Sequence, residues 1–124
     1  MPNLTIDLVL SDPKNDEYVL CLVETGPWPE VVETRLRQLQ DRLYNTFDAA
    51  VDGHVAAKFP DSMGMKIRVQ VDSHDDPPES VPAFVRKFAA HLETNTEYRE
   101  AIGKSIFIQA LRVVNGCDLG RNFA

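Results

Sequence analysis

The sequence predicts an α+β fold, a two-layer sandwich in which a mostly antiparallel sheet carries helices on one face. Three observations support this. One long stretch has the apolar spacing of a helix, several short stretches alternate as strands do, and the two kinds of stretch are interleaved. The expected order is β-β-α-β-α-(α)-β. A length of 124 residues predicts a single domain over residues 1–124 with its own core.

The first two strands are expected to form a hairpin. Residues 4–10 alternate, so that every second residue from Leu4 is expected to be buried, and residues 11–16 are rich in turn formers. Residues 18–23 are apolar throughout, which predicts a central strand covered on both faces. Cys21 in this strand is expected to be a buried core residue.

The longest predicted element is an amphipathic helix from Pro29 to Asp52. Pro29 suits the first helical position, and Gly53 predicts the end of the helix because glycine readily adopts the left-handed conformation. The opposite face, which includes Arg35 and Arg42, is expected to be solvated. The apolar residues recur at spacings of three and four and form one stripe: Val32, Leu36, Leu39, Leu43, Phe47 and Ala50.

The second half predicts a strand, two helical pieces and a last strand, after a bridge at residues 54–60 with room for a helical turn. Residues 65–72 alternate between apolar and polar, which indicates one solvated face and a sheet covered by helices on a single side. Ser80 is a candidate N-cap for a helix reaching Leu92, and residues 97–103 form a shorter piece. Residues 105–114 fit a strand or a helix, and their β-propensity favours the strand.

With these patterns the chain resembles a family of short bacterial proteins of unknown function. The resemblance rests on a hairpin, a Pro-Trp pair, a helix with a Leu-Gln-x-x-Leu core, a glycine stop and a strand of alternating charge. It covers residues 4–92 and implies a proline-led second helix, but no activity and no catalytic residues. The matching residues are Pro27-Trp28, Leu39-Gln40, Leu43, Asp52-Gly53, Phe59-Pro60, Ile67-Arg68-Val69 and Pro77-Pro78.

Composition and charge limit the functional classes. The chain is 44% hydrophobic and 26% charged, with no apolar run long enough to span a membrane and no signal peptide, so a cytoplasmic location is expected. Cys21 and Cys117 are too few for a disulfide framework. Residues 1–62 hold five Lys/Arg and eleven Asp/Glu, whereas residues 63–124 hold eight of each. This acidic first half argues against binding to nucleic acids or anionic membranes and favours a basic partner.

The chain lacks the sequence motifs of the large catalytic families, including a nucleophile elbow, a P-loop and a Cys-x-x-Cys pair. The Asp72–Asp76 loop contains three aspartates and a histidine, but its spacing matches no metal-ligand pattern, and an acidic loop before a helix also suits the helix dipole. We therefore predict neither a metal nor a cofactor. His54 and His91 are candidate general bases without a sequence-adjacent partner, so binding is favoured over catalysis.

The leading hypothesis is a non-enzymatic protein-binding module, such as an immunity-type inhibitor or an adaptor for a basic protein. Trp28, held between two prolines, would anchor an interface if exposed, or would otherwise pack on the central helix or the sheet edge. One alternative is a small-molecule or metal-binding protein, or an enzyme, with a site near His54 or the Asp72–Asp76 loop. The other is a homo-oligomeric structural protein, such as a homodimer, joined through an exposed strand edge or through the C-terminal tail. The predicted binding residues are Trp28, Glu30, Glu33, Asp41 and Asp48.

Overall fold

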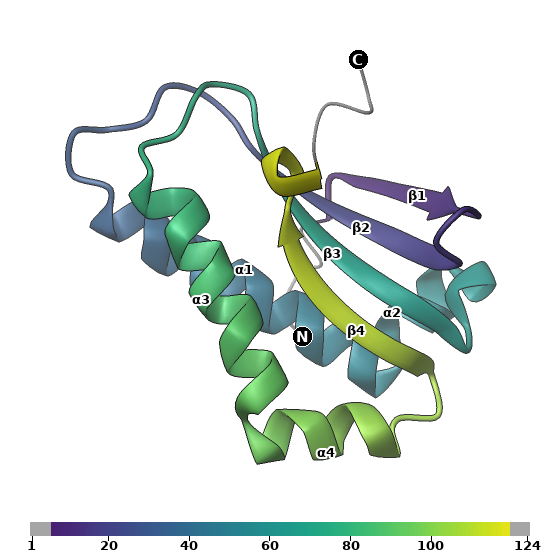
Figure 1. Ribbon diagram of the computed structural model, residues 1–124. Helices are drawn as coiled ribbons and strands as arrows, with labels where there is room; N and C mark the ends of the chain where they lie inside the picture. Colours follow the sequence, from purple (N-terminus) through teal and green to yellow (C-terminus); the bar gives the residue numbers. More distant parts are fainter. Residues whose placement is uncertain (1–5, 120–124) are drawn as a thin grey trace.

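The computed structural model describes residues 6–119 and confirms the α+β class (Figure 1). One four-stranded sheet contains β1 (Leu8–Asp12), β2 (Glu17–Glu24), β3 (Met65–Ser73) and β4 (Ile108–Asn115), in that order across the sheet. The helices are α1 (Glu33–Asp52), α2 (His54–Lys58), α3 (Ser80–Thr94) and α4 (Thr96–Lys104), and the short 3-10 helices are η1 (Pro60–Ser62) and η2 (Gly116–Leu119). Within this range no helix is long and apolar enough to cross a bilayer.

The sheet is mixed, so the prediction of a mostly antiparallel sheet was wrong. β1 pairs antiparallel with β2, but β2 with β3 and β3 with β4 are parallel. The reason is that α1 and α3 each carry the chain back along the sheet, so that the next strand starts at the same end as the one before. The predicted element order also lacked α2 and the two 3-10 helices.

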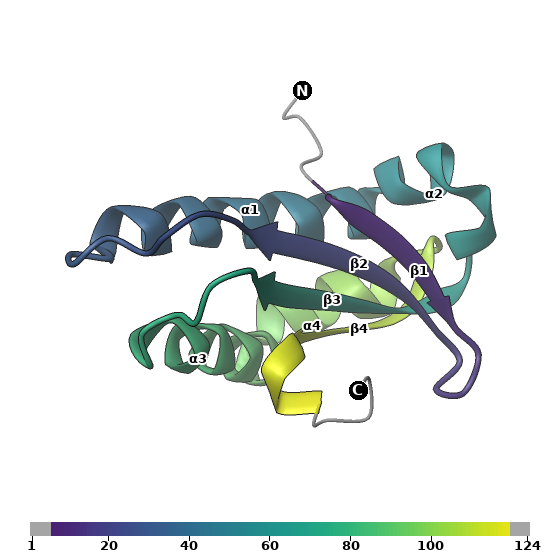
Figure 2. The same ribbon diagram turned by 90° about the horizontal axis from the view of Figure 1, so that it is seen from above.

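The helices pack on one face of the sheet, which gives two layers (Figure 2). The buried core joins that face of β2, β3 and β4 to the predicted stripe of α1, of which Leu39, Leu43, Phe47 and Ala50 are almost fully buried. We call the opposite side of the sheet the helix-free face. Figure 2 shows that both α1 and α3 begin at the same end of the molecule, where β2 and β3 finish.

The boundaries of α1 agree with the prediction at one end only. The helix begins at Glu33 and not at Pro29, and residues 25–32 instead form a loop. It ends as predicted, because Gly53 has a φ of 92° and caps the helix in the left-handed conformation. Gly53 is required for a second reason: a Cβ at this position would lie 2.7 Å from the ring of Phe107.

The predicted burial of the first strand was wrong. Leu8 and Leu10 pair with Cys21 and Val19, which places them on the helix-free face, and 50% and 46% of their surface is exposed. A strand alternates strictly between faces, so this register turns Val9 towards the core instead. Leu4, the start of the predicted strand, lies outside the described residues.

The last strand is confirmed, since β4 covers residues 108–115 and the helical alternative is wrong. The second helix is also present, but Ser80 is its first residue and not its N-cap, a position held by Glu79. The short third piece, α4, is capped by Asn95, whose side chain accepts a hydrogen bond from the backbone N–H of Tyr98 at 3.2 Å.

Candidate protein-binding surface

The helix-free face carries a group of four charged side chains that neutralise one another. Nη1 of Arg68 donates to Asp12 at 2.8 Å and to Glu17 at 2.9 Å. Arg112 binds both carboxylate oxygens of Glu17, at 2.7 and 2.8 Å. Glu17 and Arg68 are only 5% and 6% exposed, so the prediction that this side of β3 is solvated was wrong. We call these four residues the sheet network.

The pKa values of the sheet network reflect this pairing. Burial acts to raise the pKa of Glu17, but its hydrogen bonds and ion pairs with Arg112 and Arg68 outweigh burial and leave the pKa below its usual value. Hydrogen bonds from Asn15 and Arg68 lower the pKa of Asp12 to about 2. Both carboxylates are therefore ionised at neutral pH, and the network stabilises the fold.

A second group pairs the carboxyl end of β2 with α1. Glu24 is buried and accepts hydrogen bonds from Arg35 at 3.1 Å and from Arg42, which also binds Asp7 at 2.8 Å. The prediction that Arg35 and Arg42 face solvent was therefore wrong, because both turn towards these carboxylates. The outer face of α1 consequently keeps its carboxylates but loses two of its positive charges.

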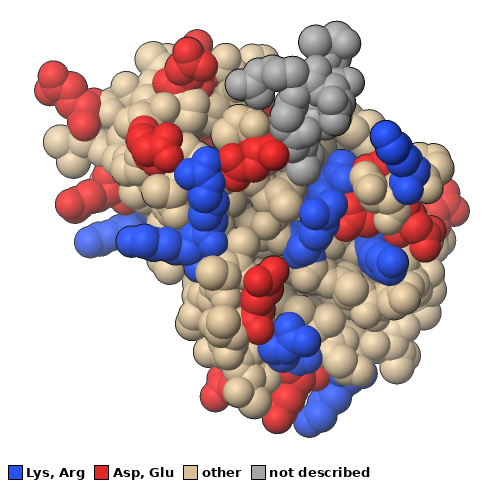
Figure 3. Space-filling model, in the orientation of Figure 1, with Lys and Arg blue, Asp and Glu red and all other residues tan. Residues whose placement is uncertain are grey.

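Two loops from distant parts of the sequence lie together at the carboxyl ends of β2 and β3 (Figure 1). We call residues 25–32 and 74–79 the double loop. They are joined at their bases by the backbone N–H of His74, which donates to the carbonyl of Glu24 at 3.0 Å. The double loop contains four carboxylates, four prolines and no lysine or arginine. Figure 3 shows acidic side chains over this part of the molecule, whereas both signs are interleaved over the sheet.

Trp28 connects the two halves of the double loop. Its Nε1 donates to the backbone carbonyl of Asp75 at 3.3 Å, and the guanidinium of Arg35 lies 4.2 Å from the centre of its ring. A cation over an aromatic face is attractive, and here it fixes the loop to α1. Trp28 is half-buried, while the nearby Val31 is 72% exposed. The ring therefore orders the loop and leaves an apolar side chain at its surface.

The predicted binding residues do not form one compact patch. Trp28 and Glu30 belong to the double loop and Glu33 starts α1 beside it. Asp41 and Asp48 are exposed but lie further along the helix, and Asp48 is about 22 Å from Glu33 at a rise of about 1.5 Å per residue. Burial, followed by the charge of Asp52, raises the pKa of Asp48.

From the sequence, Asp75 and Asp76 are metal candidates or charges that suit the helix dipole, and their position beside Trp28 was not predicted. Glu30, Asp75 and Asp76 make no ion pair with any residue between 6 and 119, whereas Glu79 binds Arg86 at 3.0 Å. The parallel strands were the missing signal. Since the carboxyl ends of neighbouring parallel strands meet at one edge, the loops that follow β2 and β3 must start side by side.

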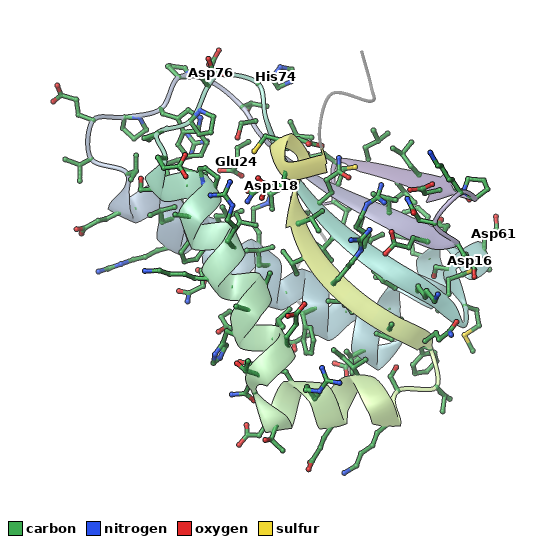
Figure 4. The ribbon with its side chains drawn as sticks, in the orientation of Figure 1. Asp16, Glu24, Asp61, His74, Asp76 and Asp118 are labelled. Carbon is green, nitrogen blue, oxygen red and sulfur yellow. The ribbon has the colours of Figure 1, made fainter. Side chains whose placement is uncertain are left out.

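The alternative sites are less developed. Figure 4 shows His74 and Asp76 on the outer side of their loop, Glu24 and Asp118 near the carboxyl end of the sheet, and Asp16 and Asp61 at the opposite end. A pocket beside Asp72, Asn115 and Cys117 has a volume of about 60 Å³, room for little more than water. His54 is exposed at the start of α2. In the described part of the chain no three His, Cys, Asp or Glu side chains are grouped to hold a metal.

Comparisons with protein-family models, curated protein sequences and solved structures give no match for this chain.

Proposed function

We propose that this protein is a non-enzymatic binding module that docks a basic segment of another protein on the double loop. An immunity-type inhibitor or an adaptor would use such a surface. The observation that carries the proposal is the contrast in pairing: the carboxylates of the sheet network and of Glu24 are matched by arginines of the chain itself, whereas those of Glu30, Asp75 and Asp76 have no ion-pair partner among residues 6–119.

Carboxylates that form no ion pair among residues 6–119 suit a positively charged partner. A potential of this kind steers a basic partner into contact and raises the association rate, an effect that salt screens. The carboxylates remain hydrated in the free protein, so the double loop costs little stability until the partner arrives. Val31 adds an apolar contact next to them.

The double loop is also restrained by its prolines and by the contacts of Trp28. Pro27, Pro29, Pro77 and Pro78 restrict the backbone, and the hydrogen bond and cation–π contact of Trp28 join both segments to α1. A surface that is ordered before binding loses less conformational entropy when the complex forms. This favours docking of a partner over a purely solvating role for the charges.

The first test is capture of partners from a lysate of the source cells at low salt and at about 0.5 M salt. We expect recovery of a specific basic protein at low salt and much less at high salt, since the Debye length falls below about 5 Å. The test variant is Glu30→Lys/Asp75→Lys/Asp76→Lys, which should recover none of this protein.

The matched control is Asp52→Lys/Asp61→Lys/Glu100→Lys. It changes the net charge by the same amount, but its three exposed residues lie away from the double loop. Equal loss of the partner in both variants would mean that net charge, not the double loop, is responsible. Asp41→Lys/Asp48→Lys then shows whether the surface extends along α1. A basic protein that binds all variants equally would contradict the proposal.

A further inference from the structure

A hollow of about 300 Å³ lies between the first turns of α1 and α3, next to the double loop. α1 and α3 begin where the two loops end (Figure 1). Glu33, which lines the hollow, directly follows residues 25–32 of the double loop. The hollow is lined by Glu33, Leu36, Arg37 and Gln40 of α1 and by Phe84 of α3.

The floor of this hollow is apolar and its rim is charged. Leu36 and Phe84 are only partly buried by the chain itself, although both pack against the core. Leu36 and Phe84 therefore present a small apolar surface between charged side chains. A volume of about 300 Å³ is at the lower limit for a small-molecule pocket. It is better matched to one large apolar side chain.

The charges beside the hollow restrict what such a side chain can belong to. Glu33 and the double loop provide negative charge on one side, and Arg37 provides a positive charge within the rim. Neither Glu33 nor Arg37 has an ion-pair partner among residues 6–119. Basic residues of a ligand are thus attracted to the loop side and repelled from Arg37.

We propose that the partner of this protein presents a basic segment with one large apolar side chain, and that this side chain fills the hollow while neighbouring lysines or arginines lie on the double loop. This inference rests on the proposed function and specifies the kind of segment that binds there. The basic residues on the double loop give an electrostatic attraction that salt screens, and the apolar side chain in the hollow gives a contact that salt does not screen.

The test uses two fluorescent synthetic peptides with the same four lysines and a single variable residue, either Phe or Ser. Their binding to the full chain is measured by fluorescence anisotropy at low salt and at about 0.5 M salt. We expect the Phe peptide to bind roughly tenfold more tightly, the factor for burying about half of a large apolar side chain. Salt should weaken the binding of both peptides but preserve the ratio of their affinities.

Two variants locate the effect. Phe84→Ala removes part of the floor, and Gln40→Phe fills the hollow from α1 without removing a core contact. Each should reduce the ratio between the peptides to about one while the Ser peptide keeps its affinity. A thermal unfolding curve shows whether each variant is folded. If Phe84→Ala does not fold, Gln40→Phe alone decides the outcome.

The outcomes separate this inference from the function on which it rests. The two peptides could bind the wild-type chain with equal affinity, and both could fail to bind Glu30→Lys/Asp75→Lys/Asp76→Lys. This result would overturn the binding of an apolar side chain in the hollow and leave the double loop as a docking site. No salt-dependent binding of either peptide would overturn both. Concentration-dependent dimerisation that Gln40→Phe abolishes would assign the hollow to a second copy of the chain and also overturn the inference.

Discussion

The sheet network and the double loop use charge in opposite ways. In the network, Glu17 and Arg68 are nearly inaccessible and form an ion pair in which Nη1 of Arg68 lies 2.9 Å from the carboxylate of Glu17. In the double loop, Glu30, Asp75 and Asp76 are exposed and form no ion pair with a basic side chain among residues 6–119. Buried charges must be paired, because an isolated one costs several kcal/mol, about the stability of a small domain. Exposed charges need no internal partner and remain available to bind another molecule.

The largest expected effect comes from removing one charge of the sheet network. Glu17→Gln leaves Arg68 with Asp12 alone in a buried site, which should lower the free energy of unfolding by about 3–5 kcal/mol. Urea unfolding followed by circular dichroism measures this change. Neutralising the double loop with Glu30→Gln/Asp75→Asn/Asp76→Asn should change the same quantity by less than about 0.5 kcal/mol.

A double variant sharpens this prediction. Glu17→Leu/Arg68→Met removes both buried charges, so that neither Glu17 nor Arg68 leaves the other buried without its partner. The double variant should therefore destabilise the fold less than Glu17→Gln alone. A double variant less stable than the single variant would show that the network contributes more than mutual neutralisation.

The second effect is a loss of stability in acid that the sheet network causes. Because the pKa values of Glu17 and Asp12 are lowered in the folded state, these groups bind protons more readily when the chain unfolds. Their contribution is complete above pH 4.5, the ordinary value for Glu17, and is lost as the pH falls towards about 2, the value for Asp12. Thermal midpoints measured between pH 6 and 2.5 should fall less steeply for Glu17→Gln than for the wild type. Parallel curves would contradict the account.

The smallest effect concerns the attachment of the double loop to α1. Arg35→Ala removes both the guanidinium over Trp28 and one ion pair to Glu24, and should destabilise the fold by about 1–2 kcal/mol. The emission of Trp28, the only tryptophan, should shift because its ring becomes more exposed. Arg37→Ala is the matched control on the same helix, and it should change neither quantity. An unchanged emission in Arg35→Ala would show that the ring is held by other contacts.

The elements with strong local patterns could be predicted from the sequence. The stripe of α1, the glycine that ends it, the apolar run of β2 and the β-propensity of β4 each depend on neighbouring residues. The direction of pairing could not, because it is set by the helices between the strands. The alternation of β3 was correct, but its polar side was wrongly expected to meet solvent.

The surfaces depend on contacts between residues far apart in the chain. Glu17 is 51 residues from Arg68 and 95 from Arg112, and Trp28 is 47 residues from Asp75. No local pattern shows that these residues meet. From the sequence, Trp28 and Glu30 are candidate binding residues, and the Asp72–Asp76 loop is a separate metal candidate. The parallel register of β2 and β3 brings the two segments together in the double loop.

The most direct test of the account measures binding and stability in the same two variants. Affinity for the purified basic partner and the thermal midpoint are compared for Glu30→Gln/Asp75→Asn/Asp76→Asn and for Glu17→Gln. We predict that the double-loop variant loses at least about tenfold in affinity and keeps its midpoint, and that Glu17→Gln, at a temperature where it is folded, keeps its affinity and has a much lower midpoint. A double-loop variant that binds the partner as tightly as the wild type, or that unfolds as early as Glu17→Gln, would contradict the division of roles between the two regions.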